Sequence, residues 1–315
     1  MKILITGGTG FLGSRLVKAL VKKSHKVAIL SRLKDTRLER IGAKFVLGSV
    51  LDLDAVTSAV RGKDIVYHLA ANLNESDPDM YSTNVIGTQN VVEACKKYKV
   101  KRIILSSSIG VLGHADKPAI EEMPYNPSTK YEKSKTDAEK IVRKGKVPFT
   151  IMRTTIILGP NRFWEQIIHA AEKNYPLVGS GSNFWHIVYI DDAVDALLLA
   201  TGKKAKNQIY NIANSDPHTY KETYFAICDA LEIARPKKQV PLWLANLAAL
   251  MHETKCRLLG KRPKVTKMRA SIARLVRNRI VSIDKAEKEL GYKPKYGLEK
   301  GIKATVKTLR QKAVR

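Results

Sequence analysis

Short apolar runs alternate with stretches of helical periodicity through the first half of the chain. The runs are four to six residues long, which predicts strands, at residues 2–6, 26–30, 44–47, 64–69, 101–105 and 149–153. The apolar positions between them recur at helical spacing and predict helices at residues 14–21, 54–60, 82–98 and 126–144. Strands that alternate with helices form a parallel sheet with right-handed crossovers. The pattern therefore predicts an α/β fold with a doubly wound parallel sheet.

The regular alternation stops after Gly159-Pro160. Later apolar runs predict two more sheet strands at residues 187–190 and 208–212, with a helix between them that Asp191 and Asp192 cap. The remaining residues are mostly helical in pattern. We therefore expect a nucleotide-binding domain over residues 1–160, completed by strands near 187–212, and a smaller helical substrate lobe over residues 161–315.

A glycine-rich turn links the first strand to the first helix. Gly7 permits a tight turn, Gly10 lets the backbone approach a pyrophosphate, and Gly13 lets the helix pack closely. The amino end of the helix offers free N–H groups and a partial positive charge to phosphates. This context predicts a dinucleotide site that includes Gly7, Gly10, Phe11, Leu12 and Gly13, with an ordinary strand–helix turn as the alternative.

Two further patterns carry candidate acid–base chemistry. The predicted helix of residues 126–144 should open with Asn126 as N-cap and Pro127 behind it, and end at Gly145. Tyr131 and Lys135 lie four positions apart on it and so share a face. A phenol, with an ordinary pKa of about 10, can pass a proton to a reacting oxygen, and a nearby ammonium lowers that pKa. A pair on the helix surface is the alternative interpretation.

Three serines, Ser106, Ser107 and Ser108, follow the fifth predicted strand. A serine at the carboxyl end of a parallel strand lies beside the ligand crevice, where it can hydrogen-bond an oxygen that gains or loses charge. The candidate catalytic residues are therefore Ser108, Tyr131 and Lys135, with Ser107 as the alternative serine.

Taken together, these motifs resemble those of the extended short-chain dehydrogenase/reductases, a family that includes nucleotide-sugar epimerases and dehydratases. Tyr131-x-x-x-Lys135 matches its catalytic pair, Asn84-Val85-Ile86-Gly87-Thr88 resembles its Asn-Val-x-Gly-Thr helix, and residues 283–294 resemble its C-terminal motif. The resemblance implies a Rossmann fold in which Tyr131 transfers the proton. It further implies that Lys135 lowers the pKa of Tyr131 and binds the nicotinamide ribose, and that Ser108 holds the substrate oxygen.

The resemblance also implies further contacts. Leu69, Ala70 and Ala71 match the segment that lies along the cofactor, and the helices of Asn84 and Tyr131 match those that pair in a homodimer. The counterpart of Asn84 supports the active site in related enzymes, although a purely structural role in the helix is the alternative.

The end of the second strand bears on the choice of cofactor. Ser31 and Arg32 stand where an acidic residue would bind the ribose 2′-hydroxyl of NAD, and Lys34 and Arg37 follow. Cations without an acid suit a 2′-phosphate, so NADP is favoured and NAD is the alternative. Ser49 replaces the aspartate that contacts adenine in the family, which leaves adenine recognition open.

Three functions remain open from the sequence. The chain lacks the Pro-Arg-Arg-x-Gly-Asp type of segment of many nucleotide-sugar epimerases, which favours resemblance to the dihydroflavonol-reductase-like and hydroxysteroid-dehydrogenase-like branch. The first expectation is an NADP-dependent reductase or dehydrogenase acting on a small, apolar or sugar-like substrate. A nucleotide-sugar epimerase or dehydratase with tightly held NAD is the second, and a non-catalytic NADP-binding regulator the third. Four aromatic residues near the expected pocket are either core or substrate lining: Phe163, Trp164, Phe184 and Trp185.

Charge is concentrated near the C-terminus. The net charge is +27, and residues 255–279 contain ten Lys or Arg and no Asp or Glu. A solvated surface is the first interpretation, and an anionic substrate, an anionic membrane or nucleic acid are alternatives. No nucleic-acid-binding motif supports the last. Apolar residues at helical spacing over 268–276, beside Lys267, Arg269, Arg274 and Arg277, are typical of a helix on a membrane surface or of one that closes a lobe.

The remaining composition points to a cytoplasmic enzyme. Three isolated cysteines, Cys95, Cys228 and Cys256, predict reduced thiols, with neither a disulfide framework nor a metal site. The first residues have the pattern of a strand and not of a secretory signal. The apolar run of residues 241–251 is too short and too interrupted to span a bilayer.

Overall fold

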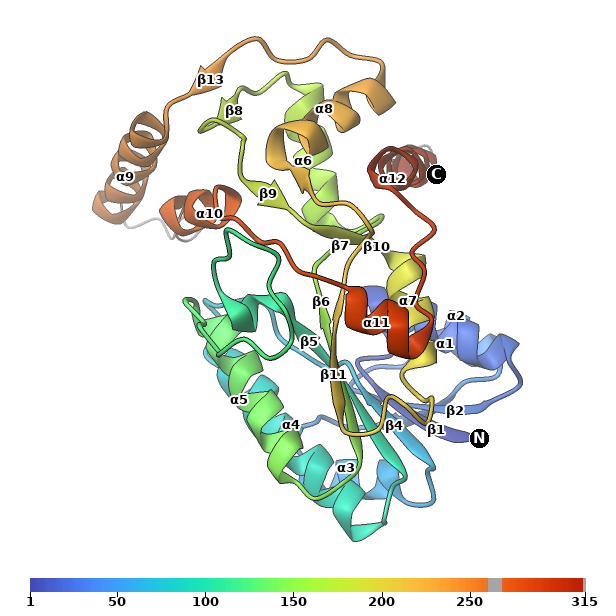
Figure 1. The fold of residues 1–315 in the computed structure, drawn as a ribbon. Coiled ribbons are helices and arrows are strands. Elements are labelled where there is room, and N and C mark those ends of the chain that lie inside the picture. Colours follow the sequence, from blue (N-terminus) through green and yellow to red (C-terminus); the bar gives the residue numbers. More distant parts are fainter. Residues whose placement is uncertain (260–267, 314–315) are drawn as a thin grey trace.

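The computed structural model describes residues 1–259 and 268–313, which form a sheet-centred domain and a second lobe beyond the carboxyl ends of its strands (Figure 1). The predicted parallel sheet is confirmed and has seven strands. In spatial order they are β3 (Lys44–Leu47), β2 (Lys26–Ser31), β1 (Lys2–Thr6), β4 (Ile65–His68), β5 (Arg102–Ser108), β6 (Phe149–Thr154) and β11 (Gln208–Ile212). Strands are added to one side of β1 up to β3 and to its other side from β4 onward. Such a switch point in strand order opens a ligand crevice at the carboxyl ends of the strands.

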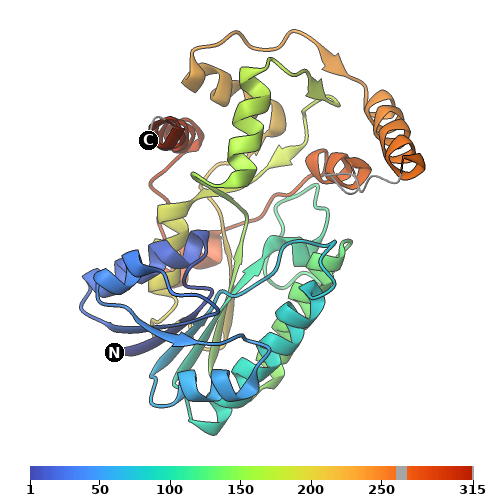
Figure 2. The ribbon, with the colours of Figure 1, turned by 180° about the vertical axis from the view of Figure 1, so that it is seen from behind.

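Helices cover both faces of this sheet (Figures 1 and 2). On one face lie α3 (Leu53–Val60), α4 (Met80–Lys97) and α5 (Lys130–Lys144). On the other lie α1 (Phe11–Lys22), α2 (Thr36–Arg40), α7 (Ile190–Leu199) and α11 (Asp284–Leu290). Alternate residues of a strand point to opposite faces, so Ile3 and Ile5 pack in one core and Leu4 in the other.

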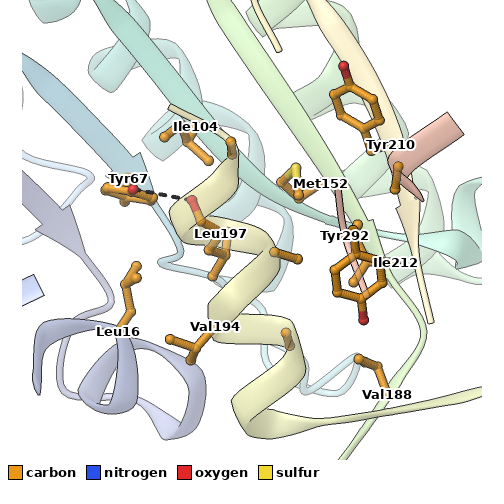
Figure 3. Packing of buried hydrophobic residues seen from close by; sticks show 14 of the residues in the cluster. Leu16, Tyr67, Ile104, Met152, Val188, Val194, Leu197, Tyr210, Ile212 and Tyr292 are labelled. Carbon is orange, nitrogen blue, oxygen red and sulfur yellow. Dashed lines mark hydrogen bonds between the residues drawn. The ribbon is translucent and has the colours of Figure 1, made fainter. Parts of the chain in front are cut away.

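The core between the sheet and α7 is shown in Figure 3. The hydroxyl of Tyr67, at the centre of the sheet, donates to the carbonyl oxygen of Leu197 on α7 at 3.2 Å. Tyr292, which follows α11, is buried in the same cluster and donates to the carbonyl oxygen of Ala213 at 2.9 Å. Burial of these rings with satisfied hydroxyls fixes two late segments of the chain onto the nucleotide domain.

The sequence-based prediction of the first part of α5 was wrong. Its N-cap is Thr129 and not Asn126, because Thr129 and Glu132 form a reciprocal capping box. The predicted end at Gly145 is confirmed. Tyr131 therefore lies in the first turn of the helix, where backbone N–H groups have no partner within the helix.

The two strands predicted after residue 160 belong to different sheets. β11 completes the main sheet beside β6, whereas the run at 187–190 forms β10 (Ile187–Tyr189), which pairs with β7 (Ile156–Leu158) in a separate two-stranded sheet. Asp191 and Asp192 lie in the first turn of α7 and do not cap it, since its N-cap is Tyr189. Because α7 and α11 pack on the nucleotide domain, residues 161–315 divide between the two parts of the molecule.

The second lobe contains α6 (Arg162–Glu172), α8 (Tyr220–Leu231), α9 (Leu242–Leu258), α10 (Met268–Leu275) and α12 (Leu298–Ala313). Its short strands are β8 (Leu177–Val178), β9 (Phe184–Trp185), β12 (His218–Thr219) and β13 (Gln239–Val240). Trp164 and Trp185 are buried here, with ring centroids 6.3 Å apart in an edge-to-face arrangement. Both tryptophans are therefore core residues of the lobe, while Phe163 remains 45% exposed.

Candidate active site

The glycine turn lies where the sequence placed it, at the switch point of the sheet. Gly7 has a φ of +72°, and a Cβ there would lie 2.6 Å from the amide nitrogen of Ala70. A Cβ on Gly13 would lie 2.1 Å from the carbonyl oxygen of Gly7. Only glycine fits at either position, and the turn thus brings Ala70 against the start of α1.

This turn has the features that a bound dinucleotide requires. Gly10 is the N-cap of α1 and no side chain caps the helix, which leaves its first N–H groups available to a phosphate. The amides of Leu69 and Ala70 donate to Thr6, at 3.1 and 3.3 Å, and hold the segment after β4 beside the turn. The predicted cofactor residues from both segments are thus adjacent.

Arg32 follows the last residue of β2. The two cations near it are paired, because Lys34 lies 3.4 Å from Glu39 and Arg37 lies 2.8 Å from Asp35. Arg32 is exposed. A hydrogen bond from Asn72 lowers the pKa of Asp77, and the charge of Arg32 adds to that shift. Arg32 therefore lies within electrostatic range of Asp77, in the loop after β4.

The three serines end β5 and have different contacts. The Ser107 hydroxyl is buried and donates to Glu139 Oε1 at 2.5 Å. Ser108 is only partly buried, and its hydroxyl accepts a hydrogen bond from the amide of Gly110 at 3.1 Å. The carbonyl oxygen of Ser106 accepts one from Lys135 Nζ at 2.5 Å. Of the two candidate catalytic serines, Ser108 is thus the one whose hydroxyl proton is not donated in a described hydrogen bond.

Tyr131 and Lys135 lie on α5, and Lys135 reaches the strand that ends in these serines. Burial raises the pKa of Tyr131 to about 12, while the charge of Arg279 acts to lower it and that of Glu132 to raise it. Burial lowers the pKa of Lys135 to about 8, against the opposite effect of Glu139. The cation that favours the phenolate is therefore Arg279, which the sequence did not single out. The expected effect of Lys135 on Tyr131 stays a prediction.

Polar side chains fix α5 to α4 and to the loop after β4. Asn84, buried on α4, accepts from the amide of Asn72 at 2.7 Å and donates to the Ser134 hydroxyl at 2.9 Å. His68 lies between the hydroxyls of Thr6 and Thr88, at 2.7 and 2.9 Å, and burial lowers its pKa to about 3. Asn84 thus contacts the helix that carries Tyr131, as a supporting residue would.

Residues 276–283, here called the crossover segment, run from α10 in the lobe back to α11 (Figure 1). The amide of Arg279 donates to the carbonyl oxygen of Phe184 in the lobe, and the amide of Ala119 donates to that of Ile280. Val276 and Asn278 line an open cavity of about 800 Å³, together with the β8–β9 turn and the start of α9. The segment therefore joins the lobe to the loop between β5 and α5.

Arg277 and Arg279 of the crossover segment contact the helix of Tyr131. Arg277 Nη1 donates to the Ser128 hydroxyl at 2.5 Å and lies 3.3 Å from Glu132 Oε1, and Arg279 Nη2 donates to the same carboxylate oxygen. The sequence interpretation missed these residues inside the basic run. The alternation Arg277-Asn278-Arg279 is the signal that could have revealed them, since alternate residues of an extended segment share a side.

The predicted stripe at 268–276 forms α10 and the residue after it, and its contact with a membrane stays a prediction. Arg269 pairs with Glu253 at 3.2 Å and Arg274 with Glu75 at 2.9 Å, while Lys267 lies outside the described residues. Met268 of this stripe is 40% exposed, and α9 adds further exposed apolar residues, among them Trp243 and Met251 at 68% and 65%. Among helices in the described ranges, none combines the length and the apolar character needed to cross a bilayer.

The profile of the family described as "NAD dependent epimerase/dehydratase" matches residues 3–213. A 2-alkyl-3-oxoalkanoate reductase of Stenotrophomonas maltophilia is 29% identical, over 96% of this chain and 98% of its own. A sterol-4-alpha-carboxylate 3-dehydrogenase, decarboxylating, of Bos taurus is 27% identical, over 96% and 91%. A UDP-glucose 4-epimerase of Thermotoga maritima, solved with UDP-glucose, superposes with a TM-score of 0.79 at 25% identity, covering both chains fully.

Proposed function

The chain belongs to the NAD dependent epimerase/dehydratase family, and from this premise we propose that it is an NAD(P)H-dependent reductase of a small carbonyl compound. Bound NAD(P)H supplies a hydride to the carbonyl carbon, and the products are the alcohol and the oxidised cofactor. The observation that carries the proposal is that Tyr131 lies partly buried in the first turn of α5, where desolvation raises the pKa of its phenol to about 12. A phenol that stays protonated at neutral pH is suited to give its proton to the carbonyl oxygen.

Each remaining residue of the site has a role that its contacts support. The Ser108 hydroxyl donates a hydrogen bond to the substrate oxygen, since Ser107 already donates to Glu139. Lys135 donates to the carbonyl oxygen of Ser106, and in this proposal it binds the nicotinamide ribose. Asn84 fixes α5 through Ser134 and thereby orients Tyr131.

The purified protein, incubated with NADPH or NADH and a panel of ketones and 3-oxo acids, tests this function. Reduced nicotinamides absorb near-ultraviolet light that oxidised ones do not. A fall in this absorbance that depends on the carbonyl compound supports the reductase. UDP-glucose belongs in the same panel because of the likeness to the epimerase. Conversion of UDP-glucose with no net change in cofactor would replace the proposal with the epimerase.

The preference for NADP over NAD rests on Arg32, and the variant Arg32→Asp tests it. We expect the ratio of NADPH to NADH affinity to fall by about 10- to 100-fold, because a charged contact to the 2′-phosphate is lost and an acceptor for the 2′-hydroxyl is gained. Titration of cofactor fluorescence measures both affinities. Arg40→Asp, an exposed cation on α2, is the matched control and should leave the ratio unchanged. A wild type that already prefers NADH contradicts the choice.

We propose that α9 binds an anionic membrane surface, because its exposed apolar residues accompany a net charge of +27. Flotation with anionic vesicles at low salt should carry the protein, and high salt should release it. Trp243→Glu should abolish flotation, whereas Tyr175→Glu, a 57% exposed aromatic of the same lobe, should not. Absence of the wild type from the floated fraction overturns the proposal. A cytoplasmic location and a homodimer through α4 and α5 stay predictions.

A further inference from the structure

The crossover segment places two guanidinium groups at the first turn of α5. Arg277 and Arg279 are each only 18% exposed at the side chain, and both donate to Glu132, the neighbour of Tyr131. The charge of Arg279 also acts on the Tyr131 phenol. These cations therefore lie within electrostatic reach of the group that exchanges the proton with the substrate.

Glu132 does not need both arginines. Its Oε2 already accepts from the Ser128 amide and hydroxyl, at 2.9 and 2.8 Å, and from the Thr129 amide at 3.1 Å. These hydrogen bonds satisfy one oxygen of a carboxylate that also caps the helix. Arg279 makes the shorter contact to Oε1, and Arg277 reaches the two carboxylate oxygens at 3.3 and 3.5 Å. One guanidinium balances the charge of one carboxylate, so the two arginines together carry one cation more than the local structure requires.

The cluster has a surplus positive charge and an unused donor. Two arginines against one carboxylate leave one net positive charge in a place largely withdrawn from water. The Nε of Arg279 is buried and has no hydrogen-bond partner among the described residues. A buried donor without a partner costs free energy, and one monoanionic group would satisfy both the donor and the charge.

We propose that Arg279, supported by Arg277, binds a carboxylate of the substrate and holds the neighbouring carbonyl group against Tyr131 and Ser108. A guanidinium presents parallel N–H donors that match a carboxylate, which gives orientation as well as affinity. This rests on the proposed reductase and names its substrate class, the 3-oxo acids. Two relatives are named for carboxylated substrates with an oxygen function at the adjacent carbon, the 2-alkyl-3-oxoalkanoate reductase and the sterol-4-alpha-carboxylate 3-dehydrogenase.

The test compares a 2-alkyl-3-oxoalkanoic acid with its methyl ester, which keeps the carbonyl and loses the charge. The wild type should show a KM about 10- to 100-fold lower for the acid than for the ester. Arg279→Gln should raise the KM for the acid to that of the ester and leave the KM for the ester unchanged. Arg279→Lys should recover part of the difference in KM between acid and ester, because lysine keeps the positive charge but lacks the parallel N–H donors of a guanidinium.

Arg274→Gln is the matched control. Arg274 lies in the last turn of α10, two residues before the crossover segment, and pairs with Glu75 and not with Glu132, so the ratio of the two KM values should stay at the wild-type level. Both KM values are measured on the same preparation, and KM does not depend on the amount of active enzyme. A variant that folds in reduced amount therefore still gives a valid ratio. Octanoate and UDP, added separately as competitors, distinguish a carboxylate from a phosphate.

Several results would overturn the assignment and leave the reductase standing. These are equal KM values for acid and ester in the wild type, a loss in Arg279→Gln that affects both substrates equally, or competition by UDP and not by octanoate. A wild type that oxidises NAD(P)H with neither compound, nor with any other ketone, overturns the proposed function itself. The two failures are therefore distinguishable.

Discussion

Tyr131→Phe is expected to lower turnover by about 10²- to 10⁴-fold while dinucleotide affinity stays close to that of the wild type. The variant removes the phenolic proton and leaves the ring that packs in the first turn of α5. No described hydrogen bond of the folded chain involves that hydroxyl, so stability should hardly change. Steady-state kinetics with the 3-oxo acid and titration of NADPH binding measure the two effects separately.

The pH dependence of the same reaction gives an independent check of the role of Tyr131. Because burial raises the pKa of Tyr131 to about 12, the proton donor for reduction is present throughout the neutral range. The oxidation of the alcohol requires the phenolate, so its rate should rise with pH as the phenol is deprotonated. Tyr131→Phe should lose this rise.

Tyr81→Phe is the control for the loss of a tyrosine hydroxyl. Tyr81 is 49% exposed on α4 and donates to Asp137 at 2.9 Å, away from the serines of β5. Turnover in this variant should remain near that of the wild type. If Tyr131→Phe also turned over at the wild-type rate, the acid–base role of Tyr131 would be wrong.

Local signals account for the parts of the fold and site that the sequence predicted. Gly13 is needed because of contacts with Gly7 and Gly8 of the same turn, and Gly7 because of its left-handed φ and its approach to the segment after β4. Tyr131 and Lys135 share a face through helix geometry alone. The strands of the main sheet have apolar runs that stop at polar turns, and six of the seven precede Pro160 in a regular alternation.

The missed features depend on residues far apart in the chain. Arg277 and Arg279 meet Glu132 across about 145 residues, and a run of cations without acids gives no indication of such a distant partner. The pairing of β10 with β7 likewise joins residues about 30 positions apart in the chain, and the apolar run of β10 does not indicate which strand it pairs with. The start of α5 differs for a local reason, because the reciprocal hydrogen bonds of Thr129 and Glu132 cap the helix three residues after Asn126.

Arg153→Met is expected to lower the free energy of unfolding by about 3–5 kcal/mol, a large part of the stability of a typical protein. Arg153 on β6 is 1% exposed and Glu139 on α5 is fully buried. Nη2 of Arg153 donates to Glu139 Oε2 at 2.8 Å, and Nε donates to both carboxylate oxygens at 3.1 and 3.2 Å. Removing the guanidinium leaves a buried carboxylate without its counter-charge. Urea denaturation followed by circular dichroism measures the loss.

Two comparisons separate this cost from the general effect of removing an arginine. Arg235→Met removes an equally short contact to Asp229, but both side chains are about half exposed, so the cost should be about 1 kcal/mol or less. The double variant Arg153→Met, Glu139→Met should regain most of the lost stability, because it leaves no unpaired charge. Equal losses in Arg153→Met and Arg235→Met would contradict this account. Because Glu139 also accepts from Ser107 of β5, the buried pair holds α5 against the strand that carries Ser108. Arg153→Met should therefore lower turnover as well as stability, although Arg153 lies outside the reacting groups.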